Sequence, residues 1–188
     1  MKYRFIAPAC LMAILTIVGV LMAFGKAEPP GWSKISEIGM TATSCFGVCP
    51  AYEVSFTNGG SARLIWKPPH RKIIILRDSL FAHIAGGEVS NELLASRDFL
   101  IFTGRISAET FNSLAQILES KDFFDMVDHI EKVTDLPSFN FSATSENEIK
   151  KIKMYGTRPP QSMLDIKSSI EETIAKIDWD FEKTIENR

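Results

Sequence analysis

Residues 51–67 read AYEVSFTNGGSARLIWK, and they carry the clearest structural pattern in the chain. Apolar side chains alternate with polar ones from Tyr52 to Phe56, which is the period of a strand buried on one face. Asn58-Gly59-Gly60 follows, and these residues accept the positive φ that a tight turn requires. The alternation resumes from Ala62 to Trp66. The stretch therefore predicts a β-hairpin with one apolar face.

Four further segments have the pattern of strands. Residues 34–40 alternate imperfectly, and residues 99–103 form a short apolar run. Residues 139–143 and 149–155 alternate on either side of a polar turn, which predicts a second hairpin.

A helix is predicted from Ser107 to about Lys121. Ser107 has the side chain of an N-cap, and Glu109 follows in the first turn, where the helix dipole favours a negative charge. Apolar residues recur at helical spacing on the predicted buried face, namely Phe111, Leu114, Ala115 and Leu118.

A second helix is predicted to begin at Pro159-Pro160 and to include Phe181. Its apolar residues lie near one face, and this stripe is expected to pack on the core. They are Met163, Ile166, Ile170, Ile174, Ile177 and Phe181.

Residues 34–188 are thus expected to form a single α+β domain, with an antiparallel sheet of hairpins and two helices packed on one face. An irregular insertion is predicted at about 68–98. Within it, residues 72–76 resemble a buried strand, and residues 79–84 and 92–96 resemble short helices.

The first 25 residues are predicted to direct export. Lys2 and Arg4 precede an uncharged run from Phe5 to Phe24, and a polar, proline-rich linker follows at 26–33. This order is typical of a signal peptide. The run is also long enough to span a bilayer as an uncleaved inner-membrane anchor. In both cases the positive charges place the domain outside the cytoplasm, in the periplasm or an equivalent compartment.

Charge argues against a nucleic-acid partner. The chain carries a formal charge of -2, and removal of Lys2 and Arg4 with the leader makes the remainder more acidic. Phosphate contacts require clustered Lys and Arg side chains. The short basic run at 67–72 is more typical of a solvated loop.

Removal of the leader takes Cys10 with it and leaves two cysteines, Cys45 and Cys49. An even pair in an oxidising compartment indicates first a structural disulfide. A redox-active pair and a soft-metal site are the alternatives, and the spacing is similar to that of exported copper chaperones of the cytochrome oxidase assembly type. Those proteins place the pair before a helix, whereas here a strand follows.

Several motifs occur in one order along the chain: Cys45-Phe-Gly-Val-Cys-Pro-Ala-Tyr52, the glycine turn, Gly104-Arg-Ile-Ser107, Lys121-Asp-Phe-Phe124, Thr134-Asp-Leu-Pro137 and Ile177-Asp-Trp179. Together they resemble an uncharacterised bacterial family, a domain of unknown function with the motifs CFGxCPxY and TDxP. The resemblance covers about residues 34–179 and implies a small exported or envelope-associated domain with no assigned activity.

No metal or cofactor site is expected. The three histidines, His70, His83 and His129, lack partners at ligand spacing, and the sequence has no nucleophile elbow or phosphate loop. Asp135 is the one acidic residue with a candidate role, as a general base or cation ligand; its alternative role is to form the turn before Pro137.

These patterns favour a non-enzymatic envelope domain that binds a protein, peptide or cell-wall partner and is stapled by a Cys45–Cys49 disulfide. The alternative function is thiol–disulfide redox chemistry or copper handling by the same two cysteines.

Overall fold

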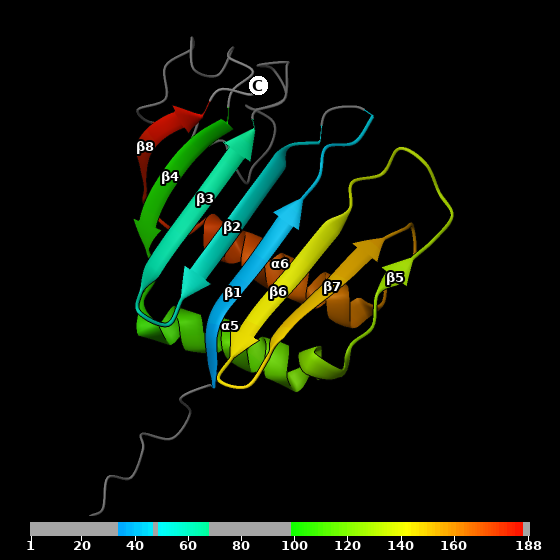
Figure 1. Ribbon diagram of the computed structural model, residues 1–188, viewed down its shortest axis with the longest axis horizontal. Coiled ribbons are helices and arrows are strands. Elements are labelled where there is room, and N and C mark those ends of the chain that lie inside the picture. The colour runs from blue at the N-terminus through cyan, green and yellow to red at the C-terminus, as the bar shows by residue number, and fades with distance from the viewer. Residues whose placement is uncertain (1–33, 47–48, 68–98, 186–188) are drawn as a thin grey trace, which may run out of the picture. The chain divides into compact units, whose positions relative to one another are not determined.

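The computed structural model describes residues 34–46, 49–67 and 99–185, and within these ranges eight strands form one sheet (Figure 1). They are β1 (Ile35–Ala42), β2 (Ala51–Thr57), β3 (Ser61–Lys67), β4 (Phe99–Arg105), β5 (His129–Ile130), β6 (Phe139–Ser145), β7 (Ile149–Tyr155) and β8 (Trp179–Ile185). Their order in the sheet is β5-β7-β6-β1-β2-β3-β4-β8. The helices α5 (Ala108–Ser120) and α6 (Gln161–Ile174) lie behind the sheet in Figure 1, on one of its faces. A short 3-10 helix, η1 (Phe123–Asp125), follows α5.

Three sequence-based predictions lie outside the described residues: the leader or anchor at 1–25, the linker at 26–33 and the insertion at 68–98. In the ranges that are described, no helix is both long and apolar enough to cross a membrane.

The predicted hairpin of residues 51–67 is confirmed. β2 and β3 pair antiparallel, with Tyr52 opposite Trp66 and Val54 opposite Leu64, so their apolar side chains share one face. Gly60 has a φ of 84° in the connecting turn, a conformation that favours glycine. The second predicted hairpin, β6–β7, is also present.

The expected sheet of hairpins is only partly correct, because the sheet is mixed. β5 pairs parallel to β7, and this two-residue strand was not predicted. Two antiparallel pairs, β1–β6 and β4–β8, join strands that are not neighbours in sequence. β1 is the centre of the sheet, since it bonds β2 on one side and β6 on the other.

The predicted first helix is confirmed as α5. The Ser107 hydroxyl accepts a hydrogen bond from the backbone N–H of Thr110 at 3.1 Å, which caps the helix start. The four residues that were expected to face the core are buried: Phe111, Leu114, Ala115 and Leu118.

The predicted second helix is too long. α6 ends at Ile174, where the indole N–H of Trp179 donates to the Ile174 carbonyl at 2.9 Å. Residues 179–185 form β8 instead, and β8 pairs antiparallel with β4. Phe181 contacts the edge of the Phe102 ring, with centroids 5.7 Å apart. The chain leaves the helix because β4 would otherwise have an unpaired edge, and Phe181 still reaches the core from the strand.

The hydrophobic core lies between the helices and the sheet face turned toward them. Its largest fully buried side chains are Trp66, Phe56, Phe102, Phe111, Phe123, Phe141, Ile35, Ile38, Met40 and Leu64. An ion pair also joins the helices, with Lys121 Nζ 2.6 Å from Asp165 Oδ2. This bond lowers the pKa of Asp165, and a second bond from Gln161 adds to the effect.

Candidate functional site

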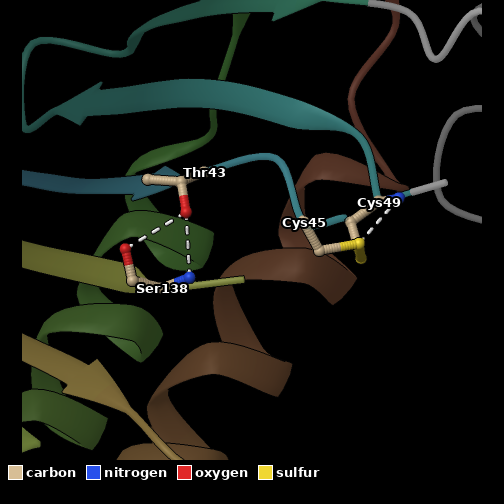
Figure 2. The surroundings of a disulfide bond; sticks show 4 residues. All are labelled: Thr43, Cys45, Cys49 and Ser138. Atoms are coloured by element: carbon tan, nitrogen blue, oxygen red, sulfur yellow. Dashed lines mark hydrogen bonds between the residues drawn. A yellow bond between two sulfur atoms is a disulfide. The ribbon is translucent and has the colours of Figure 1, made fainter. Parts of the chain in front are cut away.

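The loop between β1 and β2 carries the two predicted cysteines (Figure 2). The Sγ atoms of Cys45 and Cys49 are bonded at 2.08 Å, and their Cα atoms lie 5.4 Å apart. The backbone N–H of Cys49 donates to Cys45 Sγ at 3.3 Å. The disulfide therefore closes a small ring at one end of the central strands of the sheet.

Thr43 and Ser138 hold the base of this loop (Figure 2). The Thr43 N–H donates to the Ser138 carbonyl at 2.9 Å, and the Ser138 N–H donates to Thr43 Oγ1 at 2.9 Å. Their hydroxyl oxygens lie 3.2 Å apart and share a further hydrogen bond. These bonds extend the β1–β6 pairing by one step, so the chain that enters the loop is fixed.

Tyr52 anchors the other side of the loop to α6. Its ring is buried, and its hydroxyl donates to Glu171 Oε1 at 2.9 Å. Glu171 also binds Lys167 Nζ at 2.6 Å, and that ammonium group lies 4.8 Å from the centre of the Phe139 ring. The tyrosine of the CFGxCPxY stretch thus connects the chain after the disulfide to the helix layer.

Phe46 lies within the disulfide ring and is 90% exposed, the most exposed of the large hydrophobic side chains that the structure describes. A hollow of about 310 Å³ lies beside the loop, and Ser44, Ala51, Ile65 and Phe99 are among its lining residues. Lys67 also lines it, and its Nζ lies 5.1 Å from the centre of the Phe99 ring. An exposed aromatic side chain and a partly apolar hollow therefore occur at the same end of the sheet.

Asp135, the candidate acid, lies in the segment between β5 and β6. It is exposed, it has a φ of 67°, and among the described residues it makes no side-chain hydrogen bond or ion pair. The left-handed conformation is one that aspartate tolerates in turns. Its expected role in catalysis or cation binding stays a prediction.

Glu131 has the most strongly bound carboxylate of the described residues, and sequence reasoning missed it. It accepts hydrogen bonds from the backbone N–H and the hydroxyl of Thr157 at 2.8 and 2.9 Å. The Arg158 N–H adds a third bond at 3.3 Å, and His129 Nε2 lies at 3.2 Å. The bonds from Thr157 are the main reason that the pKa of Glu131 falls to about 2. Glu131 and Thr157 are 26 residues apart, so no local pattern marks this contact.

Of the three histidines, the described residues include His129. His129 contacts Glu131, while His70 and His83 lie outside the described residues. Within the part of the chain that the structure describes, no three His, Cys, Asp or Glu side chains are placed to hold a metal ion.

Residues 101–174, from β4 to the end of α6, match the model of a family described as a domain of unknown function, DUF6438. No curated protein and no solved structure matches the chain. The matched range starts beyond Tyr52, so the CFGxCPxY motif lies outside it. Residues 101–174 are therefore similar to an uncharacterised domain. This range lies within residues 34–179, over which the sequence motifs resemble such a family.

Proposed function

We propose that this chain is a non-enzymatic, exported domain that binds a protein, peptide or cell-wall partner through the Cys45–Cys49 loop, with Phe46 as its anchor. The observation that carries the proposal is the 90% exposure of Phe46 inside a ring closed by the disulfide. An exposed aromatic side chain next to a disulfide is available for burial against a partner.

The energetics favour this use of the loop. Complete burial of a phenylalanine side chain contributes about 1.5–3 kcal/mol. The disulfide, the Thr43–Ser138 bonds and the Tyr52–Glu171 bond hold the loop in place, so binding costs less ordering entropy than it would for a free loop.

Capture of a partner from envelope extract tests the proposal. The wild-type protein is compared with Phe46→Ala and with Val127→Ala, which shortens another apolar side chain that is 78% exposed. Loss of the anchor should weaken binding by about tenfold or more, because 1.4 kcal/mol corresponds to tenfold, whereas Val127→Ala should change little. Equal capture by all three proteins contradicts the role of Phe46.

Export is the second part of the proposal, and a reporter tests it. A disulfide is compatible with a compartment outside the cytoplasm, because the cytoplasm keeps thiols reduced. A reporter that is active only outside the cytoplasm, fused after Arg188, should be active. Activity of a cytoplasm-only reporter at the same position contradicts export.

One observation favours the alternative, a redox or copper-handling pair. The Cys49 N–H points at Cys45 Sγ, and such a donor would stabilise a Cys45 thiolate after reduction. Under the main proposal the disulfide resists reduction, with a potential below about -300 mV. A potential near -120 to -200 mV, or two rapidly reacting thiols in the natively purified protein, would favour the alternative.

A further inference from the structure

A polar hollow of about 590 Å³ lies on the sheet face opposite the helices. It extends across four neighbouring strands, β7, β6, β1 and β2. One row of its side chains follows the strand register: Lys153 is opposite Asn140, Asn140 is opposite Thr41, and Thr41 is opposite Glu53. The hollow is thus built on the central strands, which hold these side chains at fixed spacing.

In the neighbouring row of side chains on this face, Gly39 leaves room for the Ser142 side chain. It lies between Ser142 of β6 and Ser55 of β2 in the register. A Cβ atom at Gly39 would be only 2.6 Å from Ser142 Oγ, so the serine side chain occupies the space over the glycine. Small side chains therefore form the middle of this sheet face, while longer ones rise at its two ends.

Several polar side chains of the hollow have no partner within the described part of the chain. Thr41, Asn140 and Ser142 are half-buried, and none of their side chains makes a hydrogen bond to another described residue. The charged groups of Glu53 and Lys151 likewise form no ion pair among the described residues. These donors and acceptors are available to a ligand that replaces water.

The charges are separated along the hollow. Lys151 and Lys153 stand on β7 at one end, where Asp128 accepts the Lys153 backbone N–H at 2.8 Å. Glu53 stands alone on β2 at the other end. β7 and β2 are three strand spacings apart, which is about 14 Å between backbones. Two lysines outnumber the one carboxylate of Asp128 at the first end, so the hollow has an end with a net positive charge, a neutral hydrogen-bonding floor and a negative end.

We propose that this hollow binds a short peptide with both termini free, with its ammonium group at Glu53 and its carboxylate at Lys151 and Lys153. An extended chain spans about 3.3–3.6 Å per residue, so about three residues bridge the two ends once the charged side chains lean inward. Asn140 and Thr41 then bond the peptide groups between them. This inference adds a ligand class to the proposed binding role, and it does not depend on Phe46, which does not line the hollow.

Titration of the full chain with trialanine, followed by backbone amide NMR shifts, tests the proposal. N-acetyl-trialanine and trialanine amide each lose one charged end, and each should bind about tenfold more weakly than the free peptide. Glu53→Gln should lower the affinity for the free peptide by a similar factor and leave the affinity for the acetylated peptide unchanged. The double variant Lys151→Gln/Lys153→Gln should also bind the free peptide more weakly, and its affinity for trialanine amide should be unchanged. The capped peptide whose affinity each variant leaves unchanged shows which side chain binds which terminus.

Two control variants each remove one charge of the same sign as a test variant, but outside the hollow. Glu37→Gln removes an exposed acid of β1 that does not line the hollow. Lys150→Gln removes a lysine of β7 that is opposite the buried Ala143 and therefore lies on the other face. Both should bind trialanine as wild type does, and so should Phe46→Ala. Equal binding of free and capped peptides, no binding of trialanine at all, or equal effects of the control variants would each overturn the proposal. Loss of partner capture in Phe46→Ala with unchanged trialanine binding separates the two sites.

Discussion

Glu131 shows how a single residue fixes one edge of the molecule. Its carboxylate binds the backbone and hydroxyl of Thr157 just beyond β7, and its own N–H donates to the Tyr155 carbonyl at 2.8 Å. Gly156 permits this contact, because a Cβ atom there would lie 2.7 Å from Glu131 Cδ and its φ is 152°. The side chain thereby holds the segment after β5 against the end of β7.

Stability should depend on the ionisation of Glu131. The pKa of Glu131 falls from 4.5 to about 2 in the folded protein, chiefly through the Thr157 bonds, so the unfolded chain binds more protons between these values. The contribution is fully present above about pH 4.5 and is lost as pH falls through about 2. Wild type should therefore be more stable than Glu131→Gln at neutral pH, and the difference should shrink across this window in thermal melts.

A surface acid in a turn provides the control for this pH dependence. Glu146 is exposed between β6 and β7, and Glu146→Gln removes one negative charge without touching the Thr157 bonds. A constant difference between wild type and Glu131→Gln from pH 6 to pH 2 would contradict the assignment.

At the scale of the elements, α5 packs through one face. Leu114 and Ala115 are buried between Phe111 and Leu118, whereas Gln116 is exposed. Leu114→Ala should destabilise the protein by about 2–5 kcal/mol, because it removes apolar contacts and leaves a cavity. Gln116→Ala should change the free energy of unfolding by less than about 0.5 kcal/mol. Denaturant melts measure both, and equal losses would contradict the observed helix orientation.

β4 and β8 require a glycine where the chain arrives from α6. A Cβ atom at Gly104 would lie 2.5 Å from Ile177 Cγ2 and 3.1 Å from the Asp178 carbonyl oxygen. Gly104→Ala should therefore cost about 1–3 kcal/mol, since the backbone of the α6–β8 connection must shift. Gly59→Ala is the matched control, because its nearest contact would be Thr57 Oγ1 at 3.7 Å. Its free energy of unfolding should change by less than about 0.5 kcal/mol in the same melts, and an equal loss at both glycines would contradict the close contact.

For the molecule as a whole, the disulfide adds stability to a fold that the sheet and helices already specify. The buried core includes residues from β1, β2, β3, β4, α5 and α6, and neither cysteine belongs to it. Replacement of Cys45 and Cys49 by serine should lower the free energy of unfolding by about 2 kcal/mol, with a range of about zero to 4. The far-ultraviolet circular dichroism spectrum should remain that of the wild type. Loss of the folded spectrum at room temperature would contradict this view.

The elements that could be predicted from the sequence are those whose signals are local. The β2–β3 hairpin, α5 with its Ser107 cap and β7 all match their predicted positions closely. Period-2 alternation, turn glycines and capping side chains act over a few residues, so they can be read without knowledge of the rest of the chain. The Cys45–Cys49 disulfide was likewise expected, from the even pair of cysteines that remains without the leader.

Only the tertiary structure decided which strands pair across long distances. Ile177 and Phe181 have the spacing of a helix face, whereas Trp179 and Phe181 have the spacing of a strand face, and the free edge of β4 selects the strand. The two residues of β5 form a strand only because β7 lies beside them. Glu131 with Thr157, Tyr52 with Glu171, and the row from Lys153 to Glu53 depend in the same way on strand order, because each joins residues that local sequence leaves unconnected.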